Sequence, residues 1–454
     1  MPSSEWAVEC SAQSGRVYNP IRAIADNAKP SASHKSLIKL SIGDPTLDHG
    51  HLPSSLVQQA ALQEAVASRQ FGGYVPALGI PETRTAIADY WKRHHVNSDA
   101  LKRHISAENI ILTSGGSHGI LMAIAGIANP GDNILVPAPG FPHYETVAKA
   151  YDVELRFYDL NPDQNWEADM SQIKALRDER TKLIIMTNPS NPCGSNYGRE
   201  HVESFVRTAE ELKLPLFSDE MYAGMVFQTE ENPNKEYTSV ADIPSDLPRV
   251  ILCGTAKIFL VPGWRLAWLM FIDPAGHGAE YIRGVKNQAL LLVGPSTLAQ
   301  ASVAAALLKT PAEQLTRTVS IIAESAMAFH DAINSSSAAA DAKTRMVWAT
   351  MPQAAMYVML TINLHHFDPA VVTDDVTFVA ALLAEENVQL VPGVAFHAVN
   401  CCRVVITRPS ALLREAAERI ALFCERHRRS SAPESPVPEA EAPAPEEEVK
   451  EEVA

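Results

Sequence analysis

The sequence lacks the features that would direct it to a membrane, a nucleic acid or a metal ion. It has no uninterrupted run of about 18 apolar residues, the length that a membrane-spanning helix needs. Its formal net charge is −15, so no basic excess is available to bind a phosphate backbone. Its 15 histidines are scattered without the spacing of a zinc site. We therefore expect no membrane or nucleic-acid partner and no metal.

Cysteine is also scarce. The six cysteines show no disulfide framework, and Cys401 and Cys402 are adjacent and poorly placed to bridge each other. A reducing compartment is the simplest fit. Residues 1–16 contain two glutamates and no apolar core, which is typical of neither a secretory signal nor a mitochondrial presequence. The sequence therefore predicts a cytoplasmic protein, with a mitochondrial location less favoured.

Aromatic residues are missing from the C-terminal segment, residues 430–454. This segment holds eight Glu, one Lys and five Pro. A chain of this composition cannot bury enough apolar surface to order itself. We predict a disordered acidic tail after residue 429.

Short apolar runs alternate with helical periods through the first two thirds of the chain. Most of the runs are bounded by Gly, Pro, Asn or Asp, which is typical of parallel strands joined by helical crossovers. The pattern predicts an α/β fold with a mixed, mostly parallel sheet flanked by helices. The predicted strands are residues 110–112, 134–136, 183–186, 214–217 and 250–253.

The pattern changes after Ser296, where an Ala-rich helical stretch over residues 301–334 is interrupted near Pro311. Shorter strand-like pieces and a final amphipathic helix follow. We expect a smaller α+β domain here. Its predicted strands are residues 346–350, 356–362, 388–391 and 403–407, and its last helix is residues 410–427.

A single lysine, Lys257, follows the apolar run 250–253, and the turn Pro262-Gly263 then leads to Trp264 and Arg265. A lysine at the end of a buried strand can be partly desolvated, which lowers its pKa and exposes a nucleophilic amine suited to Schiff-base chemistry. An arginine offers a planar fork of donors for a phosphate. Taken alone, a solvated lysine and an ion-paired arginine would be the commoner interpretation.

Other strand ends change that balance. Residues 113–119 follow one predicted strand with small residues that let backbone N–H groups approach a phosphate, but they lack the GxGxxG spacing of a dinucleotide site. Asn191 follows a second strand, and Asp219 and Tyr222 follow a third. In parallel sheets, ligands bind at the carboxyl ends of the strands. A phosphate cradle, a buried carboxylate, a phenol and a reactive lysine together suit pyridoxal phosphate (PLP).

Several segments resemble the fold-type I, class I aminotransferases, in particular those that act on tyrosine. The similarity covers roughly residues 16–427 and implies a large PLP-binding domain, a smaller α+β domain and a homodimer with active sites at the subunit interface. It also implies ping-pong transfer of an amino group from tyrosine, and from other aromatic or neutral amino acids, to a 2-oxo acid such as 2-oxoglutarate or pyruvate. The matching segments are residues 18–24, 40–46, 188–194, 260–265 and 403–407.

The resemblance also implies roles for the residues at the strand ends. Lys257 would bind the cofactor aldehyde and then move a proton between the substrate Cα and the cofactor C4′. Asp219 would pair with the pyridinium nitrogen and keep it protonated. Asn191 and Tyr222 would hydrogen-bond the phenolic oxygen of the ring. The implied catalytic set is Lys257, Asp219 and Tyr222.

The remaining implied roles concern the phosphate, the ring face and the substrate. Phe141 would stack on the ring, and Tyr74 would reach the phosphate from a neighbouring subunit. Arg403 would bind the substrate carboxylate with two parallel hydrogen bonds, helped by the Gly43 backbone and by Asn191. The residues expected at the phosphate within one chain are Gly116, Ser117 and Arg265.

Two positions depart from the wider class. Gly254 stands where many relatives place a serine or threonine on the phosphate, so we expect that contact to be lost. Residues 287–292 contain no arginine for a second substrate carboxylate, and Arg283 or Lys286 could substitute. The preferred amino acceptor therefore stays open. A broad-specificity alanine or aromatic aminotransferase, a PLP-dependent C–S lyase and a non-catalytic ligand sensor remain alternatives.

The same resemblance divides the chain into four parts. Residues 1–48 would form an N-terminal arm and part of the small domain. Residues 49–300 would form the PLP-binding domain and residues 301–429 the C-terminal small domain. Residues 430–454 are the predicted acidic tail.

Overall fold

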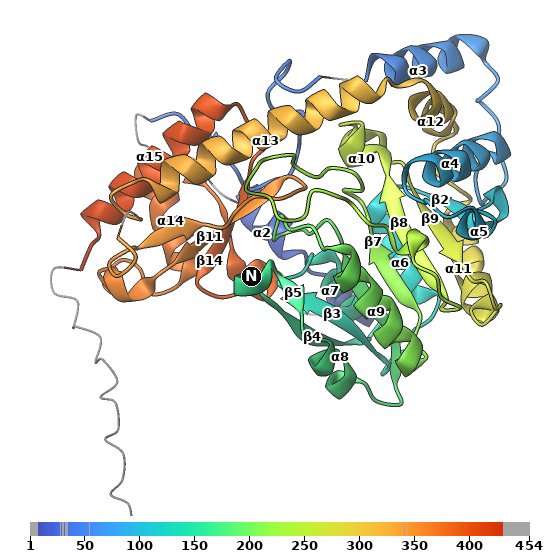
Figure 1. Ribbon diagram of the computed structural model, residues 1–454, viewed down its shortest axis with the longest axis horizontal. Helices are drawn as coiled ribbons and strands as arrows, with labels where there is room; N and C mark the ends of the chain where they lie inside the picture. The colour runs from blue at the N-terminus through green and yellow to red at the C-terminus, as the bar shows by residue number, and fades with distance from the viewer. Residues whose placement is uncertain are drawn as a thin grey trace, which may run out of the picture.

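The computed structural model describes residues 8–27, 29, 31, 35–53, 55–339 and 341–429. The predicted disordered tail lies outside the described residues. Figure 1 shows two parts, one built on a large twisted sheet and one on a small sheet, with a long helix running from one part to the other. This arrangement confirms the α/β fold with a mixed sheet and a smaller α+β part.

Within these ranges, the large sheet has eight strands in the order β2-β9-β8-β7-β6-β3-β4-β5. Neighbouring strands from β8 to β4 run parallel, whereas β9 is antiparallel to both β2 and β8, and β5 is antiparallel to β4. All five predicted strands are present. The sequence analysis did not identify β4, β5 or β9. The strands are β2 (Ile110–Thr113), β3 (Asn133–Ala138), β4 (Glu154–Asn161), β5 (Glu167–Ala168), β6 (Thr181–Thr187), β7 (Leu216–Asp219), β8 (Arg249–Gly254) and β9 (Ala267–Ile272).

The central strands are buried on both faces, which explains their continuous apolar runs. Alternate side chains point to opposite faces. Ile134 and Val136 belong to one core cluster and Leu135 to the other. The first cluster lies under α6 (Gly116–Ala125), α7 (His143–Ala150) and α11 (Ala279–Leu292), and the second under α4 (Pro81–His94), α8 (Met170–Leu176), α9 (Arg199–Leu212) and α12 (Thr297–Lys309).

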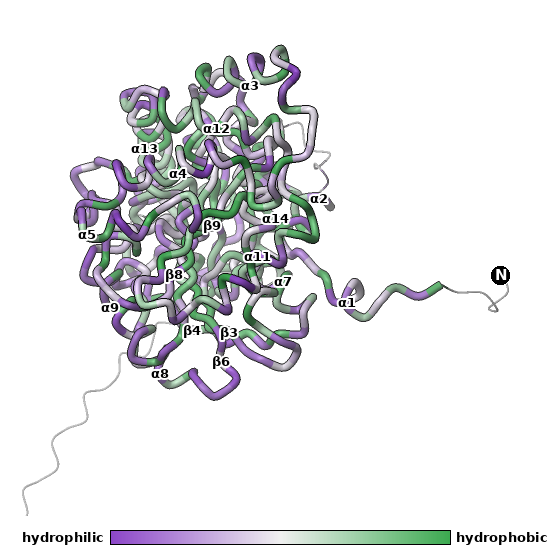
Figure 2. The backbone as a smooth tube through the Cα atoms, turned by 90° about the vertical axis from the view of Figure 1, so that its right-hand side faces the viewer, coloured by the Kyte–Doolittle hydropathy of each residue, from purple (hydrophilic) through white to green (hydrophobic). Residues whose placement is uncertain are grey.

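The large sheet is therefore the middle layer between two layers of helices. The hydropathy colouring agrees, because the segments of β8 and β9 inside the molecule are hydrophobic and many outer loops are hydrophilic (Figure 2).

The sequence also explains where individual helices begin and end. Pro81 occupies the first position of α4, where its missing N–H group costs no hydrogen bond. Glu82 lies in the first turn of that helix, and Lys92, Arg93 and His94 lie in its last turn, which complements the helix dipole. The helix that follows Pro53 is α3 (Leu56–Ser68), and the Ser55 side chain caps its N-terminus.

The small sheet has four antiparallel strands in the order β10-β11-β14-β13, within the described part of the chain. The predicted strand 403–407 lies two residues earlier, because β14 pairs with β11 in a register that sets Met359 opposite Arg403. The predicted strand 388–391 is divided at Leu390 into two short strands in different sheets. The elements are β10 (Val347–Ala349), β11 (Tyr357–Ile362), α14 (Asp375–Glu386), β12 (Val388–Gln389), β13 (Val391–Pro392), β14 (Cys401–Val405) and α15 (Ser410–Arg426).

The N-terminal arm is tied to this C-terminal part. The arm contains the helices α1 (Ala12–Gly15) and α2 (Pro20–Asn27). The arm also forms the short strand β1 (Ile38–Lys39), which pairs in parallel with β12. Gly43 lies a few residues after β1, and on the way the Leu40 carbonyl oxygen accepts a hydrogen bond of 3.0 Å from the Val405 N–H of β14, which places the Gly43 backbone beside the small sheet.

The predicted interruption near Pro311 separates α12 from α13 (Ala312–Asn334), the long helix in Figure 1. The predicted domain boundary at residue 300 lies inside α12, which packs against α3 and α4. The four-part division of the chain stays a prediction.

Candidate active site

The carboxyl ends of the central strands meet the N-terminal arm and the small sheet around a cavity of about 250 Å³. Every residue predicted for the site lines this cavity except Tyr74. The structure therefore brings together Gly43, Gly116, Ser117, Phe141, Asn191, Asp219, Tyr222, Lys257, Arg265 and Arg403.

Lys257 lies in the single-turn helix α10 (Thr255–Ile258), directly after β8. Its Nζ donates a hydrogen bond of 2.7 Å to the carbonyl oxygen of Gly43 and lies 5.9 Å from the ring centre of Tyr222. The amine thus points into the cavity and contacts the arm, from a backbone position fixed by the sheet.

Asp219 ends β7 and is 6% exposed. Its Oδ2 accepts a hydrogen bond of 2.8 Å from the Tyr144 hydroxyl, and its Oδ1 accepts one of 3.2 Å from the backbone N–H of Met221. Burial raises the pKa of Asp219 to about 6, although these hydrogen bonds act to lower it. No cation forms an ion pair with this carboxyl group among the described residues, so a buried acid faces the cavity without a counter-charge.

Arg403 presents the opposite imbalance. Its side chain is 2% exposed, and no carboxylate in the described part of the chain pairs with it. Nη1 donates to Asn191 Oδ1 (2.9 Å), and Nη2 donates to the Ser41 carbonyl oxygen (2.7 Å). The buried Nε has no hydrogen-bond partner. Burial lowers the pKa of the guanidinium, because the charged form loses hydration. An incoming carboxylate would supply the missing counter-charge.

The loop between β2 and α6 forms a cradle of suitable shape for a phosphate. The first N–H groups of α6, those of Gly116 and Ser117, have no partner inside the helix, and a helix N-terminus favours an anion. Gly115 has φ +79°, and a Cβ there would lie 2.5 Å from Nη2 of Arg265. Only glycine allows this loop and the guanidinium to approach so closely.

Gly254 has a steric explanation. A Cβ at this position would lie 2.7 Å from the Ala267 Cβ and 2.9 Å from the Leu266 carbonyl oxygen. The close pairing of β8 with β9 therefore leaves no room for the serine or threonine that many relatives carry, and a hydroxyl for the phosphate is absent here.

Two buried tyrosines near the cavity, Tyr144 and Tyr357, were not predicted from the sequence. Tyr144 holds Asp219 and also hydrogen-bonds the Thr187 hydroxyl (2.9 Å). It lies three residues after Phe141, a spacing that places side chains on one side of a helix, and this could have flagged it. Tyr357 hydrogen-bonds Tyr222, but the two are 135 residues apart and no local pattern links them.

The segment 18–24 of the N-terminal arm contributes three further lining residues, Asn19, Ile21 and Arg22. Arg22 pairs with Asp26 at 3.2 Å between Nε and Oδ2. These residues lie in the segment 18–24, which the resemblance included without assigning them a role.

Three candidate residues lie elsewhere. Tyr74 is 97% exposed. Arg283 pairs with Glu280 on α11, and neither Arg283 nor Lys286 lines the cavity of its own chain. A contact of any of these residues with a bound substrate or cofactor would therefore have to come from a second subunit.

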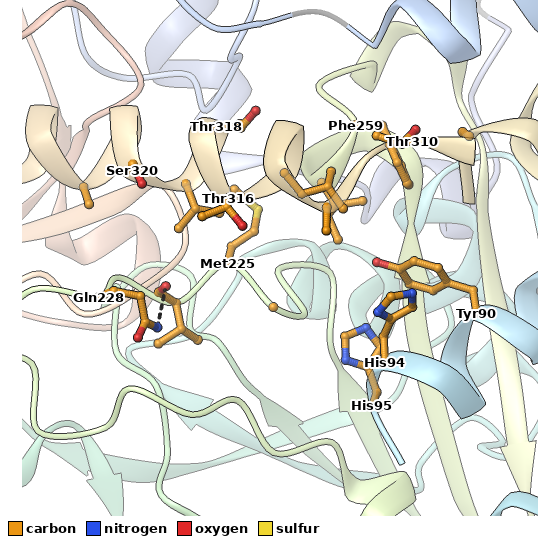
Figure 3. A pocket seen from close by; sticks show the side chains of 18 of the residues that line it. Tyr90, His94, His95, Met225, Gln228, Phe259, Thr310, Thr316, Thr318 and Ser320 are labelled. Carbon is orange, nitrogen blue, oxygen red and sulfur yellow. Dashed lines mark hydrogen bonds between the residues drawn. The ribbon is translucent and has the colours of Figure 1, made fainter. Parts of the chain in front are cut away.

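A second and larger cavity, of about 690 Å³, lies between the end of α4, the chain after Tyr222, and α13 (Figure 3). Burial lowers the pKa of His94 and lowers that of His95 to about 3, so both rings are neutral at neutral pH. Glu324 is then the one charged side chain among its described lining residues. A phosphate or a substrate carboxylate finds no cation here, so the smaller cavity is the candidate active site.

Comparison with known proteins agrees with this site and fold. The family model described as aminotransferase class I and II matches residues 35–420. The family match agrees with the sheet order and with the lysine just after β8. The chain therefore belongs to the class I and II aminotransferase family. Enzymes of this family use PLP.

Comparison with individual proteins shows which members of the family the chain resembles. The chain is 37% identical to a tyrosine aminotransferase of Bos taurus over 93% of this chain and 90% of that protein. It superimposes on the crystal structure of tyrosine aminotransferase from Leishmania infantum with a TM-score of 0.87 and 37% identity, over 94% of this chain and all of that one. It is also 30% identical to an S-alkyl-thiohydroximate lyase of Arabidopsis thaliana, over 88% of this chain and 83% of the lyase.

Proposed function

We propose that this protein is a PLP-dependent aminotransferase that moves the amino group of tyrosine to a 2-oxo acid by a ping-pong mechanism. Other aromatic or neutral amino acids would also serve as donors, and 2-oxoglutarate or pyruvate as acceptors. The tyrosine aminotransferases among its relatives support this donor. The observation that carries the proposal is one cavity lined by a buried acid without a cation, a buried arginine without an acid, and a lysine amine.

These residues fit the cofactor. When bound, PLP supplies an aldehyde for an amine and an electron-withdrawing ring that stabilises a carbanion at the substrate Cα. Asp219 would pair with the ring nitrogen, and that positive charge would offset the cost of burying its carboxylate. Gly116, Ser117 and Arg265 would hold the phosphate, and Phe141 would cover the ring. Asn191 and Tyr222 would donate to the phenolic oxygen.

The same residues then bind the substrate and move the proton. Arg403 binds the amino acid carboxylate and so directs the Cα hydrogen toward Lys257. With PLP bound, Lys257 Nζ would move the proton between the substrate Cα and the cofactor C4′, a role suited to an amine on a flexible side chain. The carbonyl oxygen of Gly43 accepts a hydrogen bond from Nζ and limits where the amine points.

A second candidate is a C–S lyase on the same scaffold, which the relative from Arabidopsis thaliana favours. Proton removal by Lys257 would be common to both reactions, and only the fate of the carbanion would differ. Purified protein with PLP, tyrosine and 2-oxoglutarate or pyruvate should form 4-hydroxyphenylpyruvate. Release of ammonia from cystathionine, without transfer from tyrosine, would instead establish the lyase.

We further propose a homodimer in the cytoplasm. Tyr74, Leu290 and Leu291 are large, exposed side chains, with Leu291 76% exposed. The loop of Tyr74 lies close to the turn between α11 and α12, because the Thr297 hydroxyl at the start of α12 donates to the Phe71 carbonyl oxygen (2.5 Å). Such a patch fits contact with a second copy, which would bring Tyr74 to the partner's phosphate. Sedimentation of the wild type and of Leu291→Asp tests the dimer. The six free cysteines fit a reducing compartment.

A further inference from the structure

Tyr357 lies at the centre of the contacts that connect the cofactor side of the cavity with its substrate side. It begins β11, is 2% exposed, and lines the cavity. Its hydroxyl lies 2.8 Å from the hydroxyl of Tyr222, and the two rings meet edge to face with their centres 5.8 Å apart. Tyr357 thus contacts the phenol expected to bind the cofactor ring.

The same residue contacts the substrate side. The guanidinium carbon of Arg403 lies 4.4 Å from the centre of the Tyr357 ring, within the range of a cation–π interaction. The two side chains come from neighbouring strands. Arg403 of β14 is opposite Met359 of β11, and Tyr357 lies two residues before Met359, so it is on the same face of the sheet. The Tyr357 ring therefore helps to hold the arginine in its place.

The hydroxyl of Tyr357 is packed as closely as its ring. A Cβ on Gly43 would lie 2.3 Å from Tyr357 Oη. The Gly43 carbonyl oxygen accepts the hydrogen bond from Lys257. The hydroxyl therefore lies where the arm, the catalytic lysine and Tyr222 come together, which leaves it little freedom to turn away from Tyr222.

We propose that Tyr357 is a positioning residue, whose hydroxyl donates to Tyr222 and so leaves the Tyr222 proton free for the phenolic oxygen of the cofactor, while its ring holds Arg403 for the substrate carboxylate. A phenol has one proton to donate. If Tyr222 gave that proton to Tyr357, it could only accept from the ring oxygen, and the oxygen would lose a donor. The proposal rests on PLP binding as proposed above.

The charges around the pair favour this direction. Burial opposes ionisation of Tyr357, but Lys257, Arg403 and the hydrogen bond to Tyr222 outweigh it and lower its pKa below the ordinary value. Burial and the neighbouring Tyr357 raise the pKa of Tyr222 well above the ordinary value. Because the positive charges of Lys257 and Arg403 around Tyr357 favour release of its proton, we assign Tyr357 as the donor in the hydrogen bond that joins the two hydroxyls.

The test uses the holoenzyme and the pH dependence of the visible absorption of bound PLP. In Tyr357→Phe the ring remains and the donor is lost, so Tyr222 binds the phenolic oxygen less strongly. We expect the pKa of the absorbance change to rise by about half a unit to one unit, because one neutral hydrogen bond contributes about 1 kcal/mol. KM for tyrosine should stay within about twofold, and kcat should fall.

A double-mutant cycle shows whether Tyr357 acts through Tyr222. Tyr222→Phe should raise the same pKa, and the double variant should match Tyr222→Phe alone. Removing the ring in Tyr357→Leu should raise KM for tyrosine about tenfold, by loosening Arg403. A purely structural residue would lower the melting temperature without these separate effects on absorbance and KM.

Three results would contradict the inference in different ways. An unchanged absorbance pKa in Tyr357→Phe, or shifts that add in the double variant, would overturn the role of the hydroxyl. An unchanged KM in Tyr357→Leu would overturn the role of the ring. A wild-type protein that takes up no PLP would overturn the proposed function itself, and the inference with it.

Discussion

Two cavities meet at the short helix α10, and their main difference is the charge of the residues that line them. Ala256 and Lys257 line the smaller cavity, whereas Ile258 and Phe259, the next two residues, line the larger one. The smaller cavity holds Asp219 and Arg403, each buried without a counter-charge. The larger cavity holds neutral histidines, hydroxyl groups and apolar side chains, and its one charged lining residue among those described, Glu324, is exposed. We assign the candidate active site to the smaller cavity because of its uncompensated buried charges rather than its volume. Such charges are costly to bury in the free protein, and a bound ligand of opposite charge offsets that cost.

The largest test of this comparison is the removal of the amine. Lys257→Ala should reduce transamination at least 10³-fold, because it removes both the group that joins PLP and the group that moves the proton. PLP should remain bound noncovalently, as absorbance after gel filtration would reveal. The matched control is Ile258→Ala, which faces the other cavity and should keep activity within several fold. Normal turnover in Lys257→Ala would refute the assignment of the site.

The second test concerns the buried cation. Arg403→Lys should raise KM for tyrosine about 30-fold or more, because an ammonium group cannot form two parallel hydrogen bonds with a carboxylate and loses about 2 kcal/mol or more. The control is Arg345→Lys, since Arg345 also stacks on an aromatic ring, 3.9 Å from the centre of Trp348, but lies outside the cavity. Its kinetics should not change. Steady-state assays across tyrosine concentrations measure both, and equal KM values would remove Arg403 from the site.

The third test uses pH to measure the cost of the buried acid. The pKa of Asp219 is about 6 in the folded protein against an ordinary value of 3.8, so the folded state holds this proton more tightly than the unfolded state. The cost is therefore absent below pH 4, grows between pH 4 and 6, and is fully present above pH 6. It is on the order of 3 kcal/mol.

Asp219→Asn should accordingly stabilise the cofactor-free protein at pH 8, and about half as strongly at pH 5, in urea unfolding. With PLP added, the wild type should be more stable than Asp219→Asn, because only the carboxylate pairs with a protonated ring nitrogen. Glu220→Gln is the control: Glu220 is equally buried, but it accepts hydrogen bonds from Ser218, Tyr237, Ser239 and the Val240 N–H. Burial also raises the pKa of Glu220, but a glutamine cannot accept all four of these hydrogen bonds, so this variant should lose stability at both pH values. A pH-independent effect of Asp219→Asn would contradict the uncompensated charge.

The smallest expected effect lies in the larger cavity. Thr316→Val replaces one hydroxyl on α13 with a methyl group of similar size (Figure 3). We expect kcat/KM for tyrosine to stay within about twofold and the free energy of unfolding within about 0.5 kcal/mol. A loss of activity comparable to that of Arg403→Lys would show that the two cavities are not independent.

The sequence allowed the cofactor side of the site to be predicted better than its surroundings. Asp219 and Lys257 each follow an apolar run, and parallel strands align their carboxyl ends, so local pattern was sufficient to place them together. Tyr144 was recoverable only from its helical spacing to Phe141. Tyr357 could not be found in this way, because its contact with Tyr222 depends on how the small sheet packs on the large one.

The fold shows the same limit. The run of β9, Ala267–Ile272, is as apolar as its neighbours, but it follows β8 after a short connection and pairs with it antiparallel, so the pattern of parallel strands with helical crossovers does not predict it. The shift of β14 and the division of residues 388–391 come from strand pairing, which no single segment specifies. Periodicity predicted which segments form strands, and long-range contacts decided their bounds.

The parallel pairing of β1 with β12 has a consequence for the synthesis of the protein. Asp219, Lys257 and the phosphate loop are all in place on the chain by the time the ribosome has passed β9, whereas β12 and Arg403 emerge more than a hundred residues later. Domains fold in the order in which they are translated. The growing polypeptide therefore contains the residues proposed to hold the vitamin-derived group well before it contains Arg403, the residue proposed to bind the substrate carboxylate. The N-terminal arm can form its pairing of β1 with β12 only after residues 388–389 have been translated.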